Sequence, residues 1–258
     1  MIYVGIGGWV FEEWRDHFYP KGLPQKRELE YAASKLTAIE VNGTYYGSQK
    51  PESFRKWHDE TPKDFVFTLK GPRFATNRRV LAEAGDSIAR FVDSGITELK
   101  DKLGPLNWQF MATKKFDAAD FEAFLKLLPK KAGSRALRHA VEVRHDSFKD
   151  KAFVQMCRDH GVAIIFAADS EFPVIADVTA DFVYARIMGT QEKEKLGYSK
   201  AMIAKWAGRA RRWEKGESPD MELLAPAAPK KQRDVFLFVI SGAKVCNPAA
   251  AQAIIAEL

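Results

Sequence analysis

Two glutamates stand near the ends of apolar segments, where a folded protein could use them for chemistry. Glu40 is the fourth residue of the run 37–42, and Glu142 is the fourth residue of the run 139–144. Two carboxylates in one site can act as a general acid and a general base when their surroundings separate their pKa values. Glycoside hydrolases and many lyases and isomerases work in this way. Glu40 and Glu142 are therefore the candidate catalytic residues of a hydrolase, lyase or isomerase.

Other polar and aromatic residues near segment ends are suited to binding a small polar ligand. Lysine and arginine hold phosphate or carboxylate groups, and aromatic rings pack against a sugar or a base. A sugar, a nucleotide or a phosphorylated metabolite would use such a set, and an anionic group on the ligand is compatible with it. The expected substrate-binding residues are Trp9, Asn42, Tyr46, Lys70, Gln109, Arg144, His145, Asp169 and Arg186.

A metal site has little support from these residues. Glu40, Glu142, Asp169 and His145 include ligand types that suit magnesium, manganese or zinc. The chain has five histidines, however, and none of them shows the paired spacing of a zinc site. We expect no metal and no other cofactor, and a second interpretation of His145 is that it anchors the strand end by hydrogen bonding.

Short apolar runs alternate with segments of helical pattern along the chain. This alternation predicts a parallel sheet covered by helices. Eight such units in 258 residues predict an α/β fold of the (β/α)₈ TIM-barrel-like type, with a doubly wound open sheet as the alternative. The expected strands are 2–6, 37–42, 64–70, 106–110, 139–144, 162–167, 182–187 and 235–240, and the expected helices are 26–36, 51–59, 86–102, 117–128, 148–160, 199–214 and 248–257.

Two connections do not fit the regular pattern. The segment 169–181 is short and contains Pro173, which disfavours a full helix. The segment 217–234 has the composition of an irregular loop. We therefore expect an imperfect barrel with a short or irregular sixth helix. Each segment lies between successive strands of one sheet, so we expect a single domain over 1–258.

Strand parity turns a set of polar side chains to the inside of this barrel. Successive side chains of a strand point to opposite faces, and barrel enzymes bind their ligands at the carboxyl ends of the strands. The set has equal numbers of basic and acidic members, so a structural layer of ion pairs is the alternative to a ligand site. The polar residues expected at one mouth are Glu40, Asn42, Thr68, Lys70, Asn107, Gln109, Glu142, Arg144, Asp169, Tyr184 and Arg186.

The formal charge of +6 and the pI near 9.1 give only weak support for a nucleic-acid partner. The most basic segment, 205–216, carries Trp206 and Trp213 on one helical face and its charges mostly elsewhere. That pattern is typical of a solvated helix packed through its tryptophans. A small-molecule enzyme is the favoured interpretation, and a noncatalytic barrel that binds nucleic acid or protein is the alternative.

No apolar run approaches the length of a membrane span, and the sequence from Met1 lacks the pattern of a signal peptide. Cys157 and Cys246 cannot form a disulfide framework. We expect a cytoplasmic protein without a membrane partner.

Several motifs are similar, in order and spacing, to those of the YecE-like family, also called domain of unknown function 72. They are "GIGGWVFEEWRDHFYPKGLP", "IEVNGTYY", "WHDETPKDFVF", "VEVRHDSF" and "TADFVYARIMG". The resemblance implies a TIM-barrel-like fold in intracellular proteins and supplies no established reaction. Met188 and the turn "ISGAKV" depart from the common pattern, which has a His and an Asn-rich turn at these places. The characteristic residues that the resemblance implies are Gly8, Trp9, Glu40, Asn42, Thr44, Tyr46, Glu142, Arg144, His145 and Arg186.

Overall fold

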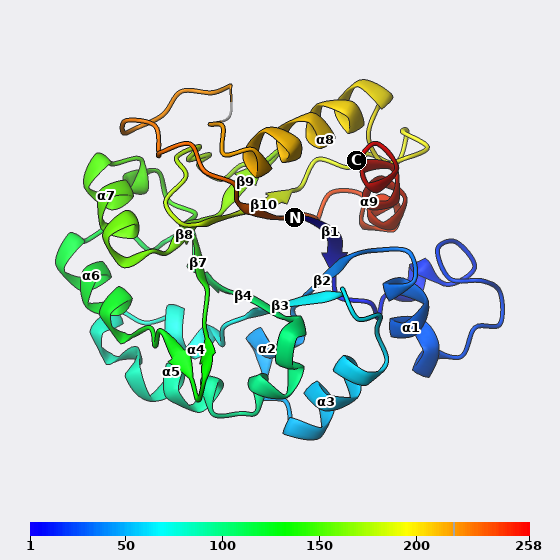
Figure 1. Ribbon diagram of the computed structural model, residues 1–258, viewed down its shortest axis with the longest axis horizontal. Helices are drawn as coiled ribbons and strands as arrows, with labels where there is room; N and C mark the ends of the chain where they lie inside the picture. The colour runs from blue at the N-terminus through cyan, green and yellow to red at the C-terminus, as the bar shows by residue number, and fades with distance from the viewer. Residues whose placement is uncertain (219) are drawn as a thin grey trace.

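The strands of the protein form a nearly closed parallel barrel. A computed structural model describes residues 1–218 and 220–258. The nine strands of the sheet follow the order β8-β7-β4-β3-β2-β1-β11-β10-β9. The two end strands, β8 and β9, are separated only by Ile165, so the two edges of the sheet come from one short segment. Figure 1 shows these strands in the middle of the molecule with helices around them.

The expected barrel is confirmed, with one correction at its sixth strand. The run 162–167 is not one strand, because Ala163–Ile164 pairs with β7 and Phe166–Ala168 pairs with β10. Because the strand is interrupted at Ile165, the single segment 163–168 pairs with one strand before the break and with another strand after it. The strands of the barrel are β1 (Ile2–Gly7), β2 (Ala38–Val41), β3 (Val66–Lys70), β4 (Leu103–Gln109), β7 (His139–Glu142), β8 (Ala163–Ile164), β9 (Phe166–Ala168), β10 (Phe182–Ile187) and β11 (Asp234–Val239).

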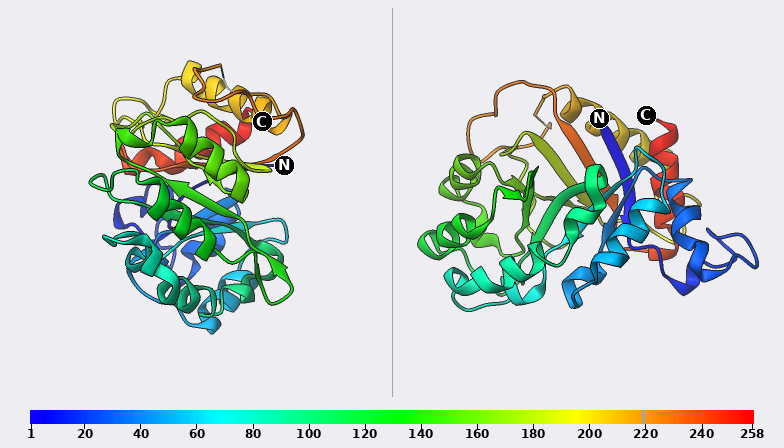
Figure 2. Two further views of the ribbon diagram at one scale, coloured as in Figure 1. Left: turned by 90° about the vertical axis from the view of Figure 1, so that its left-hand side faces the viewer. Right: turned by 60° about the horizontal axis from the view of Figure 1, so that its bottom comes forward.

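The helices lie outside the strands, as the two further views in Figure 2 show. Asp117, Asp150 and Ser199 accept hydrogen bonds from backbone N–H groups at the starts of α6, α7 and α8, which is the usual role of a capping side chain. The helices are α1 (Glu28–Ala33), α2 (Gly43–Tyr46), α3 (Pro51–Asp59), α4 (Arg73–Thr76), α5 (Gly85–Val92), α6 (Ala118–Leu127), α7 (Lys151–His160), α8 (Lys200–Glu214) and α9 (Asn247–Ala256).

The expected helix 86–102 is wrong as a single element. It divides into α5, which ends at Val92, and a 3₁₀ segment, Ile96–Lys102. Gly95 between them has a φ of 99°, a left-handed conformation that glycine adopts readily. The structure also contains elements that the sequence pattern did not predict, namely the short helices α2 and α4 and the small hairpin of β5 (Lys131–Ala132) and β6 (Arg135–Ala136).

The sixth connection is irregular, as expected. The structure has no helix over 169–181, where Asp169 takes a φ of 55° and Pro173 follows. The described residues between Glu217 and Arg233 form no helix or strand either, and position 219 of the expected loop lies outside the described residues. No helix of the described chain is long and apolar enough to cross a membrane.

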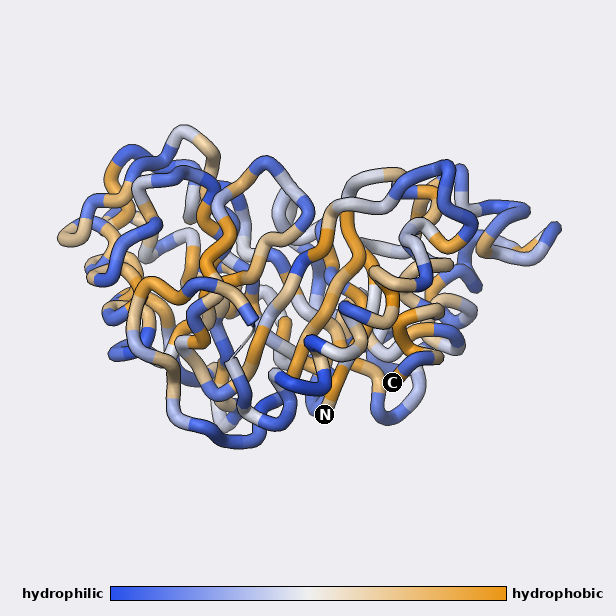
Figure 3. Tube along the Cα trace, turned by 90° about the horizontal axis from the view of Figure 1, so that it is seen from above, coloured by the Kyte–Doolittle hydropathy of each residue, from blue (hydrophilic) through white to orange (hydrophobic). Residues whose placement is uncertain are grey.

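Apolar side chains pack in two separate clusters, one between the strands and the helices and one inside the barrel. Figure 3 shows hydrophobic strands in the middle of the molecule and hydrophilic loops around them. Most of the inner cluster fills the barrel toward the amino ends of the strands. The polar residues of the same strands lie toward their carboxyl ends. The inner cluster contains Ala38, Val66, Ala140, Ala163, Ile165, Phe182, Tyr184, Phe236, Phe238 and Ile240.

Candidate functional site

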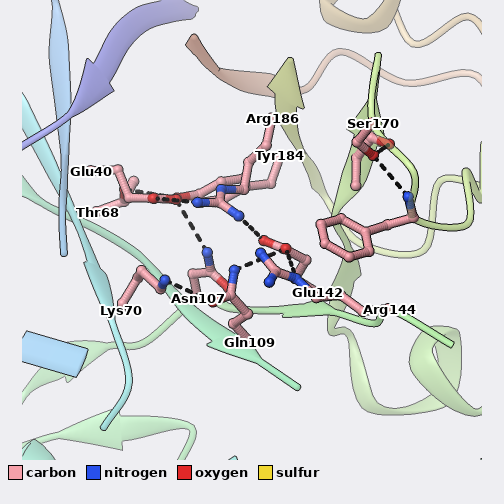
Figure 4. A network of polar contacts seen from close by, with 12 residues as sticks. Glu40, Thr68, Lys70, Asn107, Gln109, Glu142, Arg144, Ser170, Tyr184 and Arg186 are labelled. Carbon is pink, nitrogen blue, oxygen red and sulfur yellow. Dashed lines mark hydrogen bonds and ion pairs between the residues drawn. The ribbon is translucent and has the colours of Figure 1, made fainter. Parts of the chain in front are cut away.

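The alternation of side chains along the strands builds a polar layer above the apolar interior. Glu40 lies two residues after Ala38, Glu142 two after Ala140, and Arg186 two after Tyr184, so each charged residue points to the same side as an interior residue. The strand register places Glu40 opposite Thr68 and Glu142 opposite Gln109. The layer thus combines residues from β2, β3, β4, β7 and β10, as Figure 4 shows.

Arg186 bridges the two glutamates. Its Nη2 donates to Oε1 of Glu40 at 3.1 Å, and its Nη1 donates to Oε2 of Glu142. Both carboxylates are completely buried, and Arg186 is 3% exposed. A buried ion pair needs close geometry and further hydrogen bonds to offset the loss of hydration. The guanidinium therefore holds both carboxylates in one charged cluster.

The remaining carboxylate oxygens have partners of their own. Oε2 of Glu40 accepts hydrogen bonds from Tyr184 at 2.6 Å and from Asn107 at 3.1 Å. Oε1 of Glu142 accepts hydrogen bonds from Gln109 at 2.9 Å and from Arg144 at 2.7 Å. Every carboxylate oxygen of the pair is thus engaged within the protein.

The charge of the cluster shows in the pKa values of its members. Burial would raise the pKa of Glu142, but the positive charges of Arg186, Arg144 and Lys70 outweigh burial and lower that pKa to about 2. Burial and the charge of Glu40 raise the pKa of Tyr184 well above its ordinary value. Glu142 is therefore a carboxylate, and Tyr184 a neutral phenol, throughout the physiological range of pH.

Lys70 lies at the end of β3 beside this cluster. Its Nζ donates to Oε1 of Gln109 at 2.9 Å and lies 4.4 Å from the centre of the Tyr45 ring. The side chain is 6% exposed. Burial, reinforced by the charge of Arg186, lowers the pKa of Lys70 to about 8. Lys70 therefore titrates close to neutral pH.

A cavity of about 660 Å³ opens above the polar layer, at the carboxyl ends of the strands. Its walls carry four basic side chains, two tryptophans and several amides. No acidic side chain lines it in the described part of the chain. The cavity is lined by Gly7, Gly8, Trp9, Val10, Val41, Asn42, Gly43, Tyr46, Gln49, Trp57, Lys70, Gln109, Arg144, Arg186, Ile240, Ser241, Lys244 and Asn247.

The structure brings most of the expected site residues together. Glu40 and Glu142 do not line the cavity, because they lie in the buried layer beneath it. Seven of the expected binding residues line it, namely Trp9, Asn42, Tyr46, Lys70, Gln109, Arg144 and Arg186.

Two of the expected binding residues lie elsewhere. Nδ1 of His145 accepts a hydrogen bond from the backbone N–H of Ser147 at 3.1 Å, so His145 anchors the turn after β7. Asp169 is exposed and accepts a hydrogen bond from the hydroxyl of Tyr198 at 3.0 Å. The left-handed conformation of Asp169 ends the strand direction of β9, so strand parity no longer applies to its side chain.

Lys244 and Asn247 were not among the expected site residues; Lys244 begins a 3₁₀ segment after β11, and Asn247 begins α9. Nζ of Lys244 lies 3.8 Å from the centre of the Phe11 ring. Asn247 is 2% exposed, and its Oδ1 accepts a hydrogen bond from Thr190 at 2.7 Å. Their signal was their place directly after the last strand, within and beyond the "ISGAKV" turn that departs from the family pattern.

The described residues contain no group of three or more His, Cys, Asp or Glu side chains that could hold a metal ion. Of the four residues considered as possible ligands, Glu40 and Glu142 both pair with Arg186.

The fold and this site define an α/β barrel with a cationic cavity at the carboxyl ends of its strands. The sequence model described as "Protein of unknown function DUF72" matches residues 3–258, so the chain belongs to the DUF72 family. The UPF0759 protein YecE of Escherichia coli K12 is 24% identical over 251 residues, which cover 88% of this chain and 87% of YecE. The UPF0759 protein YunF of Bacillus subtilis is 31% identical over 70 residues, or 27% of this chain and 24% of YunF. The family predicted from the motifs is therefore confirmed.

Solved structures agree with the fold. A DUF72 family protein from Thermotoga maritima has a TM-score of 0.72 at 23% identity, covering 99% of this chain and 97% of its own. SacUVDE has a TM-score of 0.59 at 9% identity, covering 99% of this chain and 98% of its own. At these identities the similarity establishes the fold alone.

Proposed function

We propose that the protein is an enzyme that binds a small anionic ligand in the barrel mouth. The observation that carries the proposal is the charge of the cavity wall, where Lys70, Arg144, Arg186 and Lys244 occur without an acidic residue among the described lining. The two negative charges of the layer beneath leave this group of six charged residues with an excess of two positive charges. A phosphate or carboxylate group would balance that excess.

Arg144 is the best placed residue to hold the anionic group, and Lys244 adds a second positive charge on the wall of the same cavity. Arg186 already binds both glutamates, whereas Arg144 donates its Nε to Glu142 and keeps its side chain 24% exposed. The Arg144 guanidinium lies 4.2 Å from the centre of the Phe172 ring, which limits its movement. A fixed guanidinium at the rim of a cavity is suited to binding phosphate through two hydrogen bonds.

The other walls suit a polar ligand with a ring or a sugar-like body. Trp9 packs edge to face against Trp57 at 5.2 Å, and both rings line the cavity. Asn42, Gln49 and Asn247 add amide groups that can bind hydroxyls. A sugar phosphate or a nucleotide combines these features.

In this proposal Glu40 and Glu142 act mainly as positioning residues. Glu142 remains ionised at neutral pH, so it cannot donate a proton as a general acid. Its carboxylate orients Arg144 and Arg186 toward the cavity side of the layer. Chemistry on a bound ligand would then depend on a group that lines the cavity itself.

Binding of inorganic phosphate and pyrophosphate tests the proposal, because a ligand of the folded state raises the melting temperature. Thermal melts at constant ionic strength should show stabilisation of the wild type and of Lys205→Met, whose side chain is exposed on α8. Arg144→Met and Lys244→Met should lose most of it. Equal stabilisation of all four proteins would exclude the mouth as the anion site.

A second candidate function, binding of single-stranded nucleic acid, has one observation in its favour. Tyr46 and Phe74 are 66% and 61% exposed, which is unusual for large aromatic residues. Phe74 lines a second cavity of about 380 Å³ together with Arg78 and Arg90. Exposed rings beside arginines suit stacking of bases and pairing with phosphates.

We also propose a reducing, cytoplasmic location. Cys157 and Cys246 are both free thiols, and burial raises the pKa of each. Cell fractionation with a specific antibody checks this location.

A further inference from the structure

Lys70 differs from the other buried lysine of the protein in what surrounds its amine. Nζ of Lys102 donates to the backbone oxygens of His58 and Thr61 and to the Thr61 hydroxyl, at 2.5, 2.7 and 3.1 Å. An ammonium group has three N–H donors, so Lys102 is fully satisfied. Nζ of Lys70 has one hydrogen bond among the described residues, to Gln109.

The position of Gln109 is fixed by the charged layer. Its Nε2 donates to Glu142 at 2.9 Å, so its Oε1 is the atom that faces Lys70. The Tyr45 ring lies 4.4 Å from the same amine. No carboxylate lies within ion-pairing distance of Lys70 in the described part of the chain, although the residue lines the cavity. The amine therefore donates one hydrogen bond to Gln109 and has further N–H groups that no described residue accepts, beside the cavity.

The surroundings of this amine increase the fraction of its neutral form. Desolvation and the nearby cations Arg186 and Arg144 lower the pKa of Lys70 to about 8. A lysine with this pKa is about one-tenth neutral at pH 7, far more than an exposed lysine. A desolvated lysine next to other cations is one of the known ways in which an amine becomes a nucleophile.

We propose that Lys70 is a nucleophile that forms an imine with an aldehyde or ketone ligand, whose phosphate or carboxylate group is held by Arg144 and Lys244. This rests on the proposed anion site and names the substrate class of that site as a carbonyl compound with an anionic group. All three residues line the same cavity.

The covalent step is balanced without another reactant. The lone pair of Nζ attacks the carbonyl carbon, the C–N bond forms, and the carbonyl π electrons move to oxygen. The oxygen then leaves as water, taking both hydrogens of the neutral amine, and the imine C=N bond remains. Hydrolysis reverses the step. An imine next to a carbon–carbon or carbon–hydrogen bond withdraws electrons from it, as lyases and isomerases of this type require.

Reductive trapping tests the imine on the whole protein. The protein is incubated with glyceraldehyde 3-phosphate or with glyceraldehyde, reduced with cyanoborohydride, digested, and analysed by peptide mass spectrometry. We expect Lys70 to be modified at least tenfold faster than Lys102 and Lys244, and the phosphorylated aldehyde to react faster than glyceraldehyde. The rate at Lys70 should rise with pH and level off above about pH 8, following its pKa.

Variants separate this proposal from the anion site. Lys70→Arg keeps the charge and loses the primary amine, so it should lose the fast modification and keep the thermal stabilisation by phosphate. Lys70→Met serves as a second variant should the larger arginine not fit. Modification spread over exposed lysines, unchanged in Lys70→Arg, overturns the imine.

The two proposals fail in different ways. Stabilisation by phosphate through Arg144 and Lys244, without fast modification at Lys70, removes the imine and leaves the anion site. Fast modification of Lys70 at equal rates by both aldehydes, without stabilisation by phosphate, keeps the nucleophile and removes the anion site.

Discussion

Arg186 is the residue that makes a pair of buried carboxylates stable in the barrel. It contacts both Glu40 and Glu142, which are completely buried. Replacing it by methionine keeps most of the volume and leaves two carboxylates without their shared cation. Removal of one partner from a buried ion pair costs about 3–5 kcal/mol, so we expect Arg186→Met to lose that much free energy of unfolding in urea denaturation.

Arg144→Met is the matched control for this prediction. Arg144 also pairs with Glu142, but it is partly exposed and its removal leaves Glu142 paired with Arg186. We expect a loss below about 2 kcal/mol, within the ordinary range of point substitutions. Equal losses in the two variants would contradict the central place given to Arg186.

Lys70 should make the stability of the protein depend on pH in an unusual direction. Its pKa is about 8 in the folded protein, whereas a lysine of the unfolded chain has the ordinary value of 10.5. Between these two pH values the unfolded chain therefore binds more protons than the folded protein. The free energy of unfolding therefore rises as the pH increases from about 8 to about 10.5, and below pH 8 the charged Lys70 lowers stability. Urea denaturation over this range should show the rise in the wild type and a smaller rise in Lys70→Met.

At neutral pH, Lys70→Met should change the stability of the protein only slightly. Lys70→Met removes a charge that is costly to bury but leaves Oε1 of Gln109 without its donor, which costs about 1–3 kcal/mol. The two effects oppose each other, so the stability at pH 7 should change by less than about 2 kcal/mol. A loss as large as that of Arg186→Met would show that Lys70 is a structural residue.

Individual elements were predictable to the extent that their residues repeat a pattern. The apolar runs predicted the barrel strands, and their two-residue alternation was enough to predict that Glu40, Glu142 and Arg186 share one layer. Local departures from regularity were not predictable in this way. Leu103 begins β4 three residues before the expected start, because Gly104 and Pro105 have low strand preference and tertiary pairing includes them.

Alternation placed Asn42 and Arg144 correctly just beyond their strand ends, but it failed where the backbone turns away from the strand direction. Asp169 and His145 follow the last residues of their strands, where the backbone no longer alternates. Lys244 reaches the mouth through the fold of a turn, with its backbone oxygen accepting from Trp14 at 2.9 Å. The place of Lys244 after the last strand was a signal for the mouth, but its contact with Trp14, at a sequence separation of 230 residues, has no local signal.

Gly5 shows how closely two of these elements approach. A Cβ on Gly5 would lie 1.9 Å from the backbone oxygen of Ala38, so β1 and β2 would have to move apart. We expect Gly5→Ala to lose several kcal/mol of stability, or to fail to fold, because a well-packed core cannot absorb such a shift. Gly208→Ala on α8 is the control, since a Cβ there meets open space, and it should gain about 0.5–1 kcal/mol. Similar effects of the two changes on denaturation midpoints would contradict this packing.

At the scale of the whole molecule, the basic residues of α8 and those of the barrel mouth have different surroundings. Among the basic residues of α8, Arg212 pairs with Glu217, Arg211 donates to the backbone oxygen of Glu257, and Arg209 lies 4.9 Å from the centre of the Trp206 ring. Trp206 and Trp213 are each 1% exposed, so the expected packing of this helix through its tryptophans is confirmed. The basic residues of the mouth instead surround a cavity, where Lys70, Arg144 and Lys244 can contact a ligand.

The two candidate functions should differ in how steeply salt weakens binding. Single-stranded nucleic acid binds through many phosphates, and its affinity falls steeply with salt, by a slope of about 0.7 per phosphate contact on logarithmic axes. A small phosphate in a partly enclosed cavity is screened less than exposed charges are. We therefore expect pyrophosphate binding, measured by calorimetry, to weaken by less than about tenfold between roughly 50 and 500 mM chloride. Over about this range exposed charges become strongly screened.

A 12-nucleotide single strand, long enough for about three of the 4-nucleotide sites that single-strand binders use, is the competing ligand. In the small-anion function it should bind weakly, fail to displace pyrophosphate, and respond little to Phe74→Ala, because Phe74 lines the second cavity and not the mouth. Tight binding of the strand, with a steep salt slope and at least a tenfold loss in Phe74→Ala, would instead favour the nucleic-acid function. Lys205→Met, which removes an exposed positive charge on α8, should leave the binding of both ligands unaffected and so controls for a nonspecific effect of charge removal.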